Sequence, residues 1–204
     1  MTWLNEGIKA LQVATVLPNR GPLNIIKNIN LNQLTLMFTP DTAYSPATSS
    51  DNSDAAFTLP FGFPVDITAV QQTIDISYQG TQFAQLAIPK GPSATDVENR
   101  IIQLTFNNVP LAVIGGAHGT FDSFLAATTM GERETIGLSG SANADASTAV
   151  GLLSLTGISF SVDSTIEGLQ GLTARPVIVS NLDVNHGYPD YLLITVDGAL
   201  YNPR

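Results

Sequence analysis

The sequence predicts a mainly β fold: an antiparallel two-layer β-sandwich with a short N-terminal helix and one mid-chain helix. Three observations lead to this class. About nine or ten short segments alternate apolar and polar residues, the period of a half-buried strand. A helical pattern separates them only once after the N-terminus, which favours antiparallel sheets over βαβ units. Charged residues make up only 12% of the chain while hydrophobic residues make up 44%, a combination that suits β modules and argues against disorder.

The charge balance excludes several kinds of partner. The net charge is -9, and the eight Lys and Arg residues are scattered. Without a basic stripe to neutralise phosphates, we expect no nucleic-acid binding and no charge-driven binding to anionic headgroups. The absence of cysteine excludes a disulfide framework, a thiol nucleophile and thiolate metal sites.

The first 22 residues are predicted to form a helical lead-in and a first strand that pack on a module covering residues 23–204. Thr2 can cap a short helix in which Trp3, Ile8 and Leu11 have roughly helical spacing. A turn rich in proline and glycine, Pro18–Pro22, ends this lead-in.

Strand and loop signals alternate after this turn. The strand from Ile29 to Phe38 changes its alternation phase near Asn32–Gln33, which predicts a β-bulge. The stretch from Thr39 to Ala56 is predicted to be a long polar loop. Its aspartates Asp41, Asp51 and Asp54 could bind Ca²⁺, but they lack the spacing of an EF-hand, and a solvated loop is the preferred interpretation.

The stretch from Phe57 to Ile67 is predicted to be a stiff aromatic wedge that plugs one end of the core. Two prolines bracket an aromatic pair around a flexible glycine, so the backbone is fixed on both sides. An exposed wedge would instead be an interaction site, because dense exposed aromatics usually bind something. The candidate residues for either role are Phe57, Pro60, Phe61, Phe63 and Pro64.

The clearest hairpin of the sequence comes next. Residues 74–78 and 84–88 alternate on either side of Gln79–Gly80, and a short connection with glycine predicts a tight turn. Turns are then predicted at Pro89–Pro92 and at Asn107–Asn108, with strands over residues 102–106 and 109–114.

One helix is predicted over Thr120–Met130, where Phe121, Phe124, Leu125 and Thr128 share a face. The last third of the chain is predicted to be β again. It comprises a strand at residues 136–138, a flexible loop over residues 139–147, a strand over residues 153–162 with a bulge at Gly157, and two final strands over residues 177–184 and 191–196.

No reaction is predicted from the side chains. The nucleophile elbow Gly-x-Ser-x-Gly is absent, and the nearest approach ends at Ser139–Gly140. The glycine loop Gly115–Gly119 precedes a helix as phosphate cradles do, but the dinucleotide and P-loop spacings are not matched. His186 with Asp183 and Asp190 could bind a metal, yet aspartates of a turn are the simpler interpretation. We therefore expect neither an enzyme nor a bound cofactor.

Several motifs together resemble a fungal domain family of unknown function. The motifs are Tyr44–Ser50, Phe57–Pro64, Phe121–Phe124, Leu138–Gly140, Gly168–Leu172 and the closing Tyr201–Pro203. The resemblance implies tandem lumenal modules of large single-span membrane proteins, often vacuolar, similar to immunoglobulin-like or late-embryogenesis-abundant type 2 sandwiches. The serine that commonly follows the Asn-Pro of such units is replaced by Arg204. The family supplies no active-site residues.

If the resemblance holds, the chain is a lumenal fragment of a membrane-anchored fungal protein, expected at the vacuolar membrane. Two functions stay open. The module could be a structural unit that binds a protein partner or neighbouring modules of the same chain. Alternatively, the sandwich could open into an apolar groove that holds a lipid, since apolar residues are abundant.

Overall fold

The computed structural model describes residues 25–58, 64–149, 151–173, 178–187, 189 and 191–199. These residues are mostly β-strand, with one α-helix, α2 (His118–Met130), and one short 3-10 helix, η2 (Gln170–Leu172). The mainly β prediction with a mid-chain helix is confirmed. The strands are β1 (Ile26–Met37), β2 (Ala47–Phe57), β3 (Val65–Tyr78), β4 (Thr81–Asp96), β5 (Ile101–Val113), β6 (Arg133–Thr148), β7 (Gly151–Glu167), β8 (Ile178–Gly187) and β9 (Leu192–Ala199).

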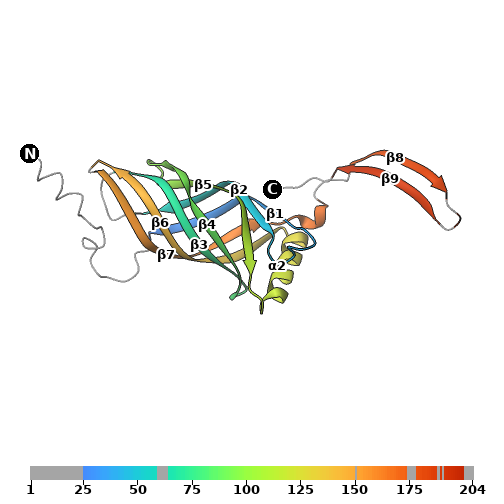
Figure 1. Ribbon diagram of the computed structural model, residues 1–204, viewed down its shortest axis with the longest axis horizontal. Coiled ribbons are helices and arrows are strands. Elements are labelled where there is room, and N and C mark those ends of the chain that lie inside the picture. The colour runs from blue at the N-terminus through green and yellow to red at the C-terminus, as the bar shows by residue number, and fades with distance from the viewer. Residues whose placement is uncertain are drawn as a thin grey trace, which may run out of the picture.

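The first seven strands form one sheet in the order β1-β2-β5-β4-β3-β6-β7. Every hydrogen-bonded pair in it is antiparallel, so β1 and β7 run in the same direction. The sheet curls until β1 lies beside β7, which brings it close to a barrel (Figure 1). Antiparallel sheet structure is thereby confirmed, whereas the predicted two-layer sandwich and its immunoglobulin-like identity are not.

The predicted hairpin is present as β3 and β4. Tyr78 pairs with Thr81, so the loop contains two residues. Gln79 and Gly80 have φ angles of 50° and 79°, as a type I′ turn requires at both central positions. This turn matches the right-handed twist of the flanking strands and fixes their register.

The predicted polar loop over Thr39–Ala56 is wrong in its second half, which is strand β2. Small polar side chains face the interior there and satisfy one another. Ser50 donates a hydrogen bond to the Asn32 carbonyl at 2.8 Å, and Ser53 donates one to Ser50 at 2.8 Å. The strand was missed because hydroxyl groups occupy buried positions that usually carry apolar side chains.

The phase change predicted in β1 occurs, but without the predicted bulge at Asn32–Gln33. Ile29 and Leu31 are buried and the partly buried positions then shift to Leu34, while the register with β2 is continuous across this point. The residues of β2 that pair with this part of β1 also change phase, because the buried positions of β2 skip from Ser50 to Ser53. The register irregularity therefore lies between β2 and β5 instead.

One further loop prediction is wrong for a similar reason. Residues 139–147, predicted to be flexible, belong to β6, where Ala142, Ala144 and Ala146 alternate as buried residues. These methyl groups are a weak apolar signal in a polar segment.

The bulge predicted at Gly157 of β7 is confirmed: the β6–β7 register shifts there, and Gly157 has a φ of 67°.

The predicted turns at Pro89–Pro92 and Asn107–Asn108 both lie inside long strands. The prolines fall in β4, where that strand has no hydrogen-bonded pairs with β5 among the described residues, although Pro92 still pairs with Ala69 of β3. Asn108 adopts a φ of 55° within β5, and its N–H binds the Ser49 hydroxyl at 2.9 Å. The Pro89–Pro92 and Asn107–Asn108 motifs therefore each mark a local irregularity within a strand and not a turn.

Helix α2 covers one end of the curled sheet, as predicted for Thr120–Met130 (Figure 1). Phe121, Phe124 and Thr128 are its buried residues, and Leu125 is partly buried. Phe124 stacks on Phe83 of β4 with ring centroids 5.2 Å apart. A separate cluster of buried side chains, around Phe57, Ile67 and Ile102, packs inside the curled sheet where β2 ends and β3 begins.

The two final strands were predicted as part of the sandwich but pair only with each other. β8 and β9 form a separate two-stranded antiparallel sheet. It projects away from the curled sheet beyond η2 (Figure 1). The predicted lead-in over residues 1–22 lies outside the described residues.

Candidate functional site

The wedge prediction can be followed only in part. Phe57 is buried at the end of β2, and Pro64 is exposed just before β3. Pro60, Phe61 and Phe63 lie outside the described residues. The part that the structure describes agrees with a core role for Phe57.

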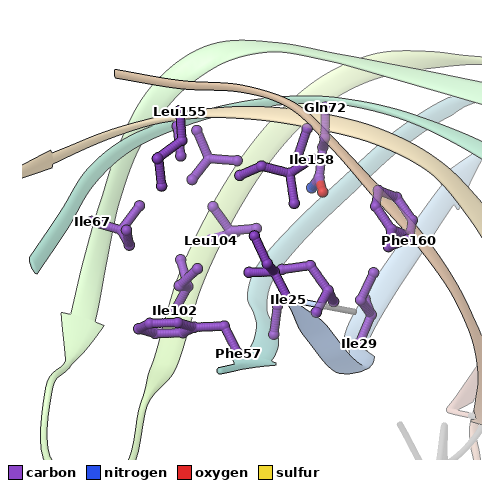
Figure 2. Close-up of a pocket in the computed structure, with 15 residues that line it drawn as sticks. Ile25, Ile29, Phe57, Ile67, Gln72, Ile102, Leu104, Leu155, Ile158 and Phe160 are labelled. Atoms are coloured by element: carbon purple, nitrogen blue, oxygen red, sulfur yellow. The ribbon is translucent and has the colours of Figure 1, made fainter. Parts of the chain in front are cut away.

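Phe57 lines an apolar cavity inside the curled sheet (Figure 2). The cavity has a volume of about 30 Å³, and Gln72 is the one polar residue among the described residues of its wall. Isoleucine, leucine and alanine side chains from six strands supply most of the rest, including Ile29, Ala55, Ile67, Ile102, Leu104, Ala142, Ala144, Leu155 and Ile158. None of the described residues that line it is charged, so its chemistry suits an alkyl chain rather than a headgroup.

The cavity spans the seam where β1 and β7 meet. Ile26 and Ile29 come from β1, and Leu155 and Ile158 from β7. Both strands are irregular at this level: β1 shifts register after Ile26, and β7 is bulged at Gly157. Bulges interrupt ladder formation. Among the described residues, no hydrogen-bonded pair joins the two strands.

The second candidate site is the β8–β9 hairpin, which is amphipathic. Val184 pairs with Ile194, and Val179 pairs with Gly198. Directly paired residues lie on the same face of a sheet, and alternate residues of a strand share a face. One face therefore carries Val179, Val184, Leu192, Ile194 and Val196, which we call the hairpin face. The opposite face carries Ser180, Asp183, Thr195 and Asp197, together with the exposed apolar side chains of Ile178 and Leu193.

All five side chains of the hairpin face are exposed. Their exposed fractions range from 50% for Val196 to 58% for Val179. A two-stranded hairpin alone is at best marginally stable in water. Contiguous exposed apolar side chains of this kind mark interaction surfaces. Within the part of the chain that the structure describes, nothing covers this face.

A polar depression lies beside the β3–β4 turn. It has a volume of about 510 Å³ and is lined by Tyr78, Arg133, Glu134 and Asp163 with their neighbours. The Tyr78 hydroxyl donates a hydrogen bond to Glu134 at 3.1 Å. Burial raises the pKa of Tyr78, and the bond to the Glu134 carboxylate raises this pKa further. The phenol therefore stays protonated at neutral pH and acts as a hydrogen-bond donor.

The other residues singled out in the sequence are not brought together. His118 begins α2 and stacks on Tyr44, with ring centroids 3.6 Å apart. Asp54, considered for Ca²⁺, accepts hydrogen bonds from the Asn30 and Asn32 amides at 2.7 and 3.0 Å. The side chain of His186 lies outside the described ones. In the described ranges, no three histidine or acidic side chains are grouped closely enough to hold a metal.

The hairpin face was missed as a site, although its strands were predicted. Alternation over residues 177–184 and 191–196 is the usual sign of a strand that buries one face. Nothing in that pattern tells whether the covering layer belongs to the same module. The sequence pattern also does not show that these two strands are separate from the seven-stranded sheet.

Comparison with known proteins finds no match to a family model, a curated protein or a solved structure. No helix over the described ranges has both the length and the apolar character to span a membrane.

Proposed function

We propose that the chain is a non-catalytic β module that acts as a structural and protein-interaction unit, and that the hairpin face is its contact surface. The observation that carries this proposal is the exposure of five large apolar side chains on one face of an isolated hairpin. Their partner is a protein or a neighbouring module of the same polypeptide.

The physical argument concerns the stability of the hairpin. Its ladder joins only two strands, too few for independent stability. Covering the hairpin face would remove apolar surface from water at about 25 cal/mol per Å². A partner that supplies the opposing layer would therefore stabilise the hairpin and bind through it at the same time.

We further propose that the seven-stranded sheet works as a sandwich of the immunoglobulin-like or late-embryogenesis-abundant type 2-like kind. Side chains from β1, β2, β3, β5, β6 and β7 line a common interior. Strand β5 pairs with both β2 and β4 and so joins β1 and β2 to the rest of the sheet. The resemblance of the sequence supports this assignment.

The same resemblance supports the proposed location. We place the module on the lumenal side of a fungal endomembrane, the vacuolar membrane, as part of a larger membrane-anchored protein with tandem modules. An engineered glycosylation site in the β3–β4 turn tests the lumenal side, as described in the Discussion.

Native electrophoresis of extracts from expressing fungal cells tests the interaction. Ile194→Asp places a carboxylate in the hairpin face, whereas Thr195→Asp places one on the opposite face. We expect the wild-type chain and Thr195→Asp to migrate in a complex that Ile194→Asp has lost. Equal migration of all three proteins would contradict the proposal.

A second candidate function is the binding of a lipid chain, favoured by the apolar cavity at the seam of β1 and β7. A volume of about 30 Å³ holds one or two water molecules at most, so an acyl chain would have to part the two strands. The absence of hydrogen-bonded pairs between β1 and β7 among the described residues favours such an opening.

Native mass spectrometry after gentle purification tests this second function. Ala142→Leu fills the cavity, and Ser141→Leu adds the same side chain at an exposed neighbour on the outer face. Lipid adducts on the wild-type protein and on Ser141→Leu, but not on Ala142→Leu, are expected. Their absence from the wild-type protein would exclude a stably bound lipid.

A further inference from the structure

We infer that the partner of the hairpin face is a second copy of this chain, and that two hairpin faces pack against each other. This inference rests on the proposed interaction function. The product would be a two-layer unit of four strands, with the β8–β9 pair of each copy forming one layer. Both layers would present the same surface, so a two-fold axis relates the copies.

The charge distribution favours a second copy. Each chain has a net charge of -9, so most contacts between copies would bring carboxylates together. Among the described side chains, the hairpin face carries no charged residue, and Asp197 lies on the opposite face, as its pairing with Ser180 shows. Face-to-face packing therefore joins two acidic molecules without placing like charges in the contact.

The same charge distribution disfavours two other partners of the hairpin face. A basic partner would be drawn to the carboxylates of the opposite face, because the hairpin face offers it no charge. A lipid surface would gain no electrostatic attraction, since strands β8 and β9 contain no lysine or arginine.

The area of the face is also sufficient. Each of the five side chains exposes at least half of its surface, so covering both copies would bury roughly 1,000 Å², the lower limit of a specific interface. Valine and isoleucine suit this packing, because β-branched side chains interlock well on pleated surfaces. Interfaces at this lower limit are typical of weak, transient complexes, for which we take a Kd on the order of micromolar, about 8 kcal/mol of binding free energy.

Sedimentation velocity of the purified chain, at concentrations from about 1 to 100 µM to span such a Kd, tests the inference. The wild-type chain and Thr195→Asp are expected to shift from monomer to dimer, and Ile194→Asp to stay monomeric. An equimolar mixture of Ile194→Asp and Ile194→Lys should recover the dimer, because opposite charges then meet across the two-fold axis. An unchanged thermal melt of the seven-stranded sheet checks that the variants fold.

Three outcomes would overturn the inference. They are a wild-type monomer over the whole range, an Ile194→Asp variant that dimerises like the wild type, and open-ended assembly in place of a dimer. None of these outcomes tests the proposed protein-interaction function, which the native electrophoresis of cell extracts tests separately. A complex there that depends on Ile194 would then contain another protein or a neighbouring module.

Discussion

Val184 and Ile194 are direct partners across the β8–β9 ladder, and both are more than half exposed. A non-polar pair at such a position normally lies under a second layer. In the seven-stranded sheet the corresponding inward pairs, such as Ala142 with Ile158, have the opposite wall above them. This difference makes the hairpin face the most specific functional indication in the molecule.

Thr48→Val is expected to stabilise the protein. The Thr48 hydroxyl is buried in β2 and has no hydrogen-bond partner among the described residues, and valine has nearly the same shape without the polar group. Removing an unsatisfied hydroxyl should raise the free energy of unfolding by about 1 kcal/mol. Urea unfolding measures this change.

Ser50→Ala is the matched control in the same strand. It removes the donor to the Asn32 carbonyl and the acceptor for Ser53. The free energy of unfolding should fall by about 1–3 kcal/mol. Stabilisation by Ser50→Ala, or destabilisation by Thr48→Val, would show that the hydroxyl network of β2 is assigned wrongly.

Gln79→Asn tests the lumenal location. The change creates an Asn-Gly-Thr sequon at positions 79–81, in the exposed type I′ turn, where Asn-Gly is the favoured dipeptide. A module exposed to the lumen should acquire an N-linked glycan there. Gel mobility before and after glycosidase treatment of the protein from fungal cells measures it.

The double variant Gln79→Asn, Thr81→Val is the control, because it keeps the turn and removes the sequon. It should migrate like the wild type. A folded Gln79→Asn protein that carries no glycan would count against the lumenal assignment.

The ion pair between Lys90 and Asp145 predicts a pH dependence. The hydrogen bond from Lys90 lowers the pKa of the Asp145 carboxyl, and the bond from Ser154 lowers it further. A carboxyl whose pKa is lower in the folded state stabilises the fold above its unfolded pKa, about 3.9. That contribution is lost as the pH falls through the folded pKa.

Lys90→Met should therefore raise the pKa of Asp145 towards its usual value. Carboxyl NMR titration measures the change directly. Both partners are partly exposed, at 56% and 38%, so solvent screens the pair and the loss of stability at neutral pH should be small. An unchanged Asp145 pKa in the variant would show that the ion pair does not form in solution.

The sequence predicted the elements whose local signals agree with their packing. Ile74, Ile76 and Gly80 identify the β3–β4 hairpin, because alternation and turn chemistry both point to two antiparallel strands with a tight connection. Phe121 and Phe124 identify the buried face of α2 in the same way. Gly157 marked its bulge, because a residue with positive φ in a strand favours glycine.

The failures came from segments in which small or polar residues are buried. Ser50 and Ser53 are inward residues of β2, and Ala144 and Ala146 are inward residues of β6. Their burial depends on hydrogen bonds and close packing across the curled sheet, which are tertiary features. The hairpin face could not be recognised for a related reason, because alternation does not reveal whether a covering layer exists.

The central claim is that the hairpin face contacts another protein chain. Photo-cross-linking in fungal cells tests it most directly, with a photoreactive phenylalanine analogue replacing either Ile194 or the adjacent Thr195. The account predicts protein adducts from position 194 and few or none from position 195, where the side chain lies on the opposite face. Equal adduct yields at the two positions, or adducts from position 195 alone, would contradict it.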